Sequence, residues 1–165
     1  FRAHLAPMGE WVDLYGRDRA FPAGQVPGFE FLGEVNKAGG AKTILVGEAR
    51  PFYVKGRVLY QTVFNVVPIA KPAGEKAYTP ALKEFIERVR PDYIYINWQE
   101  ISRLAGTYGY PESIEPKKFH FLTAPGKFKV EVAGEWGRPM TYRGQETPAR
   151  ILYHVVYDTS PPRIH

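Results

Sequence analysis

Apolar residues recur at helical spacing most clearly in the middle of the chain. Thr79 is a good cap, Pro80 suits the first helical position, and the apolar residues then fall at i, i+3, i+4 and i+7, namely Leu82, Phe85, Ile86 and Val89. Pro91 ends this helix because proline disfavours helical geometry in the residue before it. Shorter helices are predicted over residues 28–38 and 99–105.

Continuous apolar runs predict strands that are buried on both faces. Residues 43–46 (TILV) and 92–96 (DYIYI) are such runs, and residues 57–63 (RVLYQTV) predict another strand between them. Strands and helices in this order indicate an α/β fold with a small parallel or mixed sheet and covering helices. A strand order of 2-1-3 would place the first and third of these strands side by side.

The C-terminal part adds β structure to this fold. Residues 118–123 and 127–132 flank an Ala-Pro-Gly-Lys turn and predict a β-hairpin, and residues 149–157 predict the final strand. The domain organisation expected from these patterns has three parts. They are an extended arm or linker over 1–26, an α/β domain over 27–158, and a Pro-containing tail over 159–165.

Composition removes several classes of site. The 165 residues suit one domain, and the absence of cysteine excludes disulfides, thiolate metal sites and a cysteine nucleophile. The four histidines are isolated and lack metal-ligand spacing, so we expect no metal and no cofactor. The net charge of +5 comes from scattered basic residues, which does not favour nucleic-acid binding. No run approaches the roughly 18 apolar residues of a membrane helix.

Polar side chains follow two of the predicted strands. Glu48 and Arg50 come directly after residues 43–46, and Asn97, Glu100 and Arg103 follow residues 92–96. Since carboxyl ends of parallel strands share one edge, we expect the two loops to touch, with an Arg bonded to a Glu. The cluster is then either a network of ion pairs that pins the loops or a ligand-facing site. An acid–base pair of Glu48 and Glu100, as in a glycosidase, is a weaker alternative.

Aromatic residues make up 15% of the chain, which hints at interfaces. Trp98 and Tyr108 flank the predicted helix over 99–105 and offer two interpretations. They form a stacking platform for a sugar, or they pack against the sheet, which is the commoner role of such residues.

Three segments carry a family resemblance. Residues 46–53 (VGEARPFY), 58–65 (VLYQTVFN) and 93–111 (YIYINWQEISRLAGTYGYP) resemble the soluble C-terminal domain of multi-spanning membrane glycosyltransferases. That superfamily contains the dolichyl-phosphate-mannose protein mannosyltransferases and the aminoarabinose lipid A transferases. The resemblance covers about half of the chain. The matching residues are Glu48, Arg50, Phe52, Tyr53, Asn97, Trp98, Glu100, Arg103, Tyr108 and Gly109.

The resemblance implies an extracytoplasmic domain, periplasmic or extracellular, that is tethered to a membrane in the full-length protein. The family's catalytic acid lies in its membrane part, so no catalytic residue is expected here. The candidate binding cluster consists of Glu48, Arg50, Tyr53, Asn97, Trp98, Glu100, Arg103 and Tyr108. Expected partners are the membrane-embedded part of the parent protein, a glycan or polyprenyl-linked sugar, or further copies of the chain.

Three functions follow as hypotheses. The first is a non-catalytic domain that shapes the acceptor side of a membrane glycosyltransferase or docks partners. The second is a self-assembling subunit of an extracellular fibre or tubule, in which residues 1–26 and 159–165 pack on neighbouring copies. The third is a sugar- or polymer-binding module that uses Trp98 and Tyr108.

Overall fold

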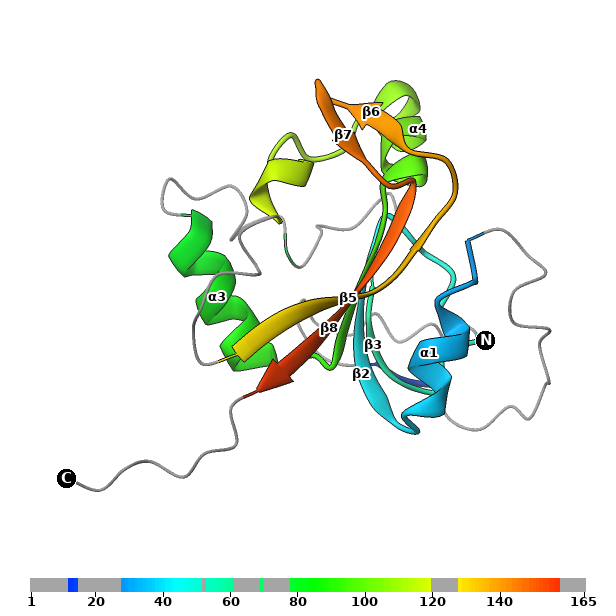
Figure 1. Ribbon diagram of the computed structural model, residues 1–165, viewed down its shortest axis with the longest axis vertical. Coiled ribbons are helices and arrows are strands. Elements are labelled where there is room, and N and C mark those ends of the chain that lie inside the picture. Colours follow the sequence, from blue (N-terminus) through cyan, green and yellow to red (C-terminus); the bar gives the residue numbers. More distant parts are fainter. Residues whose placement is uncertain are drawn as a thin grey trace.

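The fold is a mixed α/β domain in which helices cover both faces of one sheet (Figure 1). The computed structural model describes residues 12–14, 28–51, 53–60, 69, 78–119 and 128–157. Within these residues, no helix is long and apolar enough to cross a membrane.

The main sheet has six strands in the order β1-β3-β2-β4-β8-β5. Its centre is parallel: β2 (Ala41–Val46) pairs with β3 (Gly56–Leu59) on one side and with β4 (Tyr93–Asn97) on the other. These three strands have the order 2-1-3, the arrangement that places the first and third predicted strands side by side. The outer strands run antiparallel to their neighbours, and they are β1 (Val12–Leu14), β8 (Arg150–Tyr157) and β5 (Phe128–Trp136).

Three α-helices fall where the periodicity predicts them. The strongest prediction corresponds to α3 (Tyr78–Val89), and the two shorter ones to α1 (Leu32–Lys37) and α4 (Trp98–Thr107). The first of the short helices begins later than expected, at Leu32. The segment before it is not helical at Gly28, whose φ is 96°. Hydrogen bonds from Gly28 to Glu30 and from Tyr95 to Gly28 fix this segment instead.

The sheet separates two apolar cores, because successive strand residues point to opposite faces. On one face, Ile44 and Val46 pack with residues of α3 and α4, while on the other Leu45 packs with α1. Figure 1 shows α3 and α1 on opposite sides of the strands. The fully apolar run of β2 thus reflects burial on both faces, as its sequence predicts.

The C-terminal hairpin exists, but it lies further along the chain than predicted. Lys118 ends a short 3₁₀ helix, η1 (Pro116–Lys118), instead of starting a strand, and residues 120–127 lie outside the described residues. The hairpin is formed by β6 (Met140–Tyr142) and β7 (Gln145–Thr147). Its two turn residues have positive φ, 51° and 74°, which suits a tight hairpin turn, and they are Arg143 and Gly144.

The prediction for 1–26 can be followed only at residues 12–14, which form β1 and pair with β3. The prediction for the tail over 159–165 lies outside the described residues.

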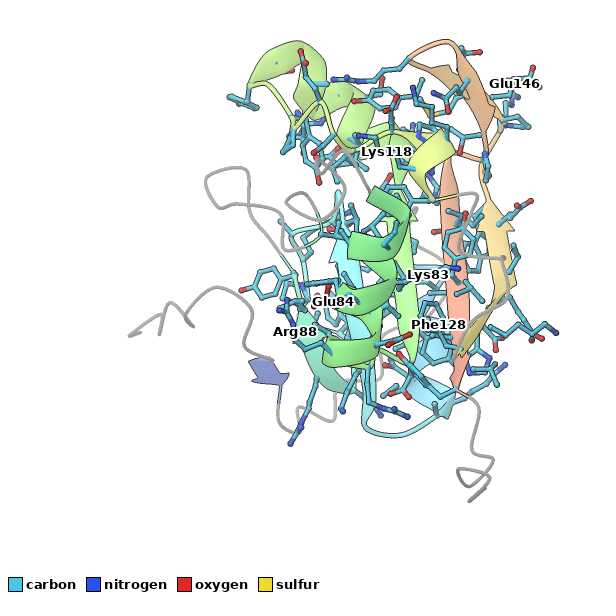
Figure 2. The ribbon with its side chains drawn as sticks, turned by 90° about the vertical axis from the view of Figure 1, so that its left-hand side faces the viewer. Lys83, Glu84, Arg88, Lys118, Phe128 and Glu146 are labelled. Atoms are coloured by element: carbon cyan, nitrogen blue, oxygen red, sulfur yellow. The ribbon has the colours of Figure 1, made fainter. Side chains whose placement is uncertain are left out.

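We expect α3 to be held mainly by its apolar face. Ile86→Ala should lower the free energy of unfolding by about 2–5 kcal/mol, since Ile86 is fully buried between helix and sheet. Glu84→Ala, on the exposed side of the same helix (Figure 2), should change it by less than about 0.5 kcal/mol. Chemical denaturation of both variants checks this. Equal losses would show that the apolar face of α3 does not dominate its contribution to stability.

Candidate functional site

The loop after β2 holds a buried carboxylate. Gly47 has a φ of 72°, a conformation that suits glycine, and it turns the chain so that Glu48 points back under its own loop. Arg50 supplies three donors to Glu48: its backbone N at 3.1 Å, Nε at 2.7 Å and Nη2 at 2.8 Å. The guanidinium also lies over the ring of Phe29, 4.5 Å from its centre. This ion pair is bidentate and held by packing from one side.

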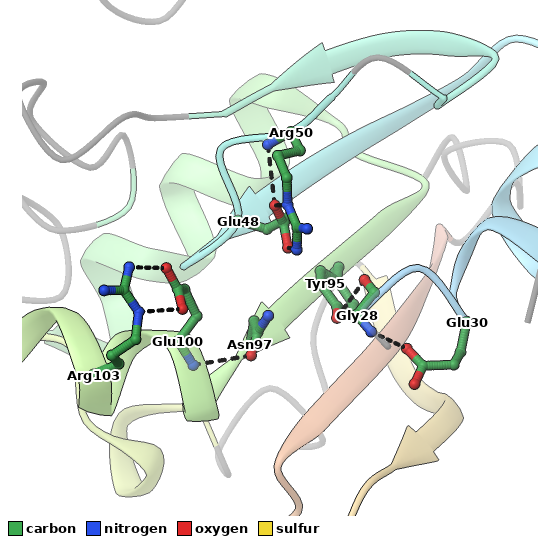
Figure 3. Close-up of polar contacts among 8 residues, drawn as sticks. All are labelled: Gly28, Glu30, Glu48, Arg50, Tyr95, Asn97, Glu100 and Arg103. Carbon is green, nitrogen blue, oxygen red and sulfur yellow. Dashed lines mark hydrogen bonds and ion pairs between the residues drawn. The ribbon is translucent and has the colours of Figure 1, made fainter. Parts of the chain in front are cut away.

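The loop after β4 turns directly into α4. The side chain of Asn97 accepts the backbone N–H of Glu100 at 3.1 Å, which satisfies one of the free donors at the helix start. Arg103, three residues further along the helix, donates to both carboxylate oxygens of Glu100 at 2.6 and 2.8 Å. These hydrogen bonds keep the pKa of Glu100 below its usual range. Figure 3 shows both ion pairs.

The two loops touch, as predicted, but each ion pair closes within its own loop. A Cβ at Gly47 would lie 2.8 Å from the carbonyl oxygen of Asn97 and collide with Ile101, so the two loops are in contact there. The charges also act across the gap, since Glu100 raises the pKa of Arg50 and Arg50 lowers that of Glu100. These cross-loop effects are smaller than those within each pair. The loops are thus joined mainly by packing.

The aromatic candidates do not form a platform. Trp98 is only 1% exposed and packs against the rings of Phe119 and Tyr142, so the prediction of a sugar-stacking role for Trp98 is wrong. Its position at the first turn of α4 points its ring into the core. Tyr108 follows the other end of this helix and is 67% exposed. Tyr53 stands edge-on to the ring of Phe29 and is half-buried.

A second layer of polar residues lies next to the cluster, and the sequence patterns did not identify it. Tyr95 donates its hydroxyl to the carbonyl of Gly28 at 3.0 Å, and the N–H of Gly28 donates to Glu30 at 2.8 Å. A Cβ at Gly28 would lie 3.2 Å from Nη2 of Arg50 and 3.9 Å from Nδ2 of Asn97. The segment before α1 therefore lies against both loops, and the φ of Gly28, 96°, is a conformation that favours glycine.

Arg150 connects this layer to the last strand. Its guanidinium donates to Glu30 at 2.9 Å and to Gln99 at 2.8 Å, while its Nε is buried without a hydrogen-bond partner among the described residues. Arg150 pairs with Asn97 in the sheet, which places it at the same edge. The signal available in the sequence was a charged residue at the start of an otherwise apolar strand.

The chemistry of the site is that of a fixed, charge-balanced network. Burial raises the pKa of Tyr95 far above its ordinary value, and the nearby Glu48 and Glu30 raise it further, so Tyr95 remains a hydrogen-bond donor. Among the described residues, no group of three His, Asp or Glu side chains could hold a metal ion. A cavity of about 290 Å³ lies beside Trp98 of the candidate cluster, with Phe119, Val132 and Tyr153 also in its wall.

We expect Arg150 to be the most sensitive member of the network. Arg150→Met should lower the free energy of unfolding by about 3 kcal/mol, because it leaves Glu30 a largely buried charge without its cation. Arg150→Met combined with Glu30→Met should recover part of this loss. Arg103→Met, which breaks an exposed pair, should cost less than about 1 kcal/mol. Urea denaturation checks the ranking, and equal effects of Arg150→Met and Arg103→Met would contradict it.

Comparisons of the chain with known proteins provide no relative for this site. No model of a known family, no curated protein and no solved structure matches the sequence or the fold.

Proposed function

We propose that this chain is a non-catalytic, extracytoplasmic docking domain of a membrane glycosyltransferase-like protein. Its role is to bind the membrane-embedded part of the parent protein and to shape the acceptor side of that site. The proposal starts from the resemblance of residues 46–53 and 93–111 to such domains. In the fold, these two segments end β2 and β4 and lie in contact at one edge of the sheet.

The observation that carries the non-catalytic role is the closure of each ion pair within its own loop. A general acid in sugar chemistry has to keep a proton near neutral pH, which requires a raised pKa. The pKa of Glu100 is shifted the opposite way by Arg103. Glu48 is buried beneath Arg50, which occupies both of its carboxylate oxygens. This arrangement suits a stable surface better than proton transfer.

A docking surface remains on the outside of these pairs. The side chains of Arg50 and Arg103 are 50% and 55% exposed although their inner sides are bonded to glutamates. Tyr108 extends from the end of the same α4 helix. Arginine and tyrosine are the residue types that contribute most often to protein interfaces, and restraint by ion pairs lowers the entropy lost on binding.

The burial of Trp98 weighs against the sugar-binding alternative, which relied on Trp98 together with Tyr108. The self-assembly alternative relied on residues 1–26 and 159–165, of which only residues 12–14 belong to the part of the chain that the structure describes.

The first test is an activity assay. We expect the isolated chain to transfer no sugar from a polyprenyl-phosphate donor to acceptor peptides, because the proposed role needs no catalytic group. Radiolabelled donor and product separation provide the measurement. Turnover that disappears in Glu48→Gln or Glu100→Gln would show that the cluster is an active site and would overturn the proposal.

The docking role needs its own measurement. A photo-crosslinking amino acid at Tyr108 in the full-length gene product should label the membrane-embedded part of the same protein. The matched control is the same amino acid at Lys55, which is exposed at the start of β3 and should not produce that product. Mass spectrometry of the crosslinked peptides identifies the target. Labelling from Lys55 alone, or from neither position, would contradict a docking surface at α4.

A further inference from the structure

The strand β5 forms an open edge of the sheet. It is nine residues long, Phe128–Trp136, and it pairs with β8 on one side, while no described strand lies on its other side. Figure 2 shows β5 at the margin of the sheet, with Phe128 at the end near α3. An edge of this length presents a row of backbone donors and acceptors that another strand can pair with.

The hydrogen-bond pattern identifies which residues present those groups. Val155 donates its N–H to Asp92, at the start of β4, so Val155 faces β4 and its neighbours His154 and Val156 face β5. Their partners in β5 are Glu131 and Lys129. Because backbone groups alternate in direction along a strand, the N–H and C=O groups of three other residues point to the open edge, namely Phe128, Val130 and Val132.

These outward groups are symmetric about Val130. We propose that two copies of the chain associate through antiparallel pairing of β5 with β5, with the two-fold axis at Val130. In this register Val130 faces Val130 of the second copy, and Phe128 faces Val132 of the second copy. All three outward-facing residues then form hydrogen-bonded pairs, and the two sheets become one continuous sheet.

The side chains support the same register. Lys129 of one copy lies opposite Glu131 of the other, twice per dimer, so opposite charges face each other across the new strand pair. These are non-hydrogen-bonded positions, where side chains approach most closely. Within one chain the same two residues already attract each other, with Nζ of Lys129 2.6 Å from the carboxylate of Glu131. Shifting the register by two residues would remove both cross-strand ion pairs.

The apolar face of β5 contributes one exposed side chain. Val132 is 53% exposed, and Phe128 of the second copy, which would lie opposite it, is 3% exposed and packed in its own core. The register shift between Val132 and Gly134 then ends the regular edge. Pairing is therefore limited to the part of β5 before this irregularity. A two-fold contact of this kind uses the same patch on both copies and produces a closed dimer instead of a fibre.

Charged residues on an edge strand can also prevent pairing, and this alternative has to be weighed. A protective pattern places like charges where two copies would meet. Here the charges around Val130 are of opposite sign and related by the two-fold axis, so self-pairing brings Lys129 to Glu131 and not to another lysine. The surface is separate from Arg50, Arg103 and Tyr108, so dimerisation does not depend on the proposed docking function.

Cysteine crosslinking tests the register directly, because the chain has no cysteine of its own. A mixture of the single variants Lys129→Cys and Glu131→Cys should form a disulfide-linked dimer under mild copper-catalysed oxidation. The paired Cα atoms would lie about 4.5 Å apart, within the range of a disulfide. Either variant alone should crosslink at least about tenfold more slowly, since identical positions are diagonal neighbours about 7–8 Å apart. Equal rates in all three samples would overturn the proposal.

Charge reversal provides the second arm, measured by analytical ultracentrifugation. The wild-type chain should dimerise reversibly with a dissociation constant below about 1 mM, the range of a weak interface. Lys129→Glu and Glu131→Lys should each weaken the dimer about tenfold, and mixing the two variants should restore it as a heterodimer. Lys55→Glu, far from β5 in the strand order, should leave the dissociation constant unchanged. A wild-type chain that stays monomeric, or variants whose mixture does not recover, would overturn the proposal.

Discussion

The guanidinium of Arg150 connects the parts of this fold that are furthest apart in the sequence. It bonds to Glu30, 120 residues earlier, and to Gln99, 51 residues earlier. These contacts join the last strand, the segment before α1 and the first turn of α4 at one edge of the sheet. Because the pair is nearly buried, losing either partner would leave a charge with little access to water. The candidate cluster therefore rests on an interaction that fixes three elements at once.

At the same edge, the glutamates of the cluster stabilise the loops, while the arginines bonded to them keep one side exposed to solvent. Glu48 is buried and fully engaged by Arg50, yet the outer side of that arginine remains exposed. Glu100 and Arg103 repeat this arrangement on α4. Charge balance within each loop means that neither loop needs the other for neutrality. The contact between Gly47 and Asn97 can then set their spacing by packing alone.

The lateral edge of the sheet formed by β5 has a different character. At β5 the exposed features are backbone groups and a short self-complementary sequence around Val130. The exposed arginines lie in the loop after β2 and in α4, whereas the open backbone groups lie around Val130 in β5. One chain can therefore present a rigid polar surface and an open strand without competition between them. This separation makes docking and self-association compatible functions.

The sequence by itself indicated the three helices, the buried central strands and the final strand, and it placed the polar loops after β2 and β4. The continuous apolar runs of β2 and β4 are typical of strands buried on both faces, and the carboxyl ends of parallel strands lie at one edge of a sheet. The tertiary structure decided the rest. Trp98 is buried because Phe119 and Tyr142 pack around it, and Arg150 joins the site through partners distant in sequence. The hairpin formed at β6–β7, where two residues tolerate positive φ. A local sequence pattern indicates which face of a strand or helix a residue lies on. It does not indicate which residues distant in the sequence pack against that face, and the burial of Trp98 and the bonds of Arg150 depend on those residues.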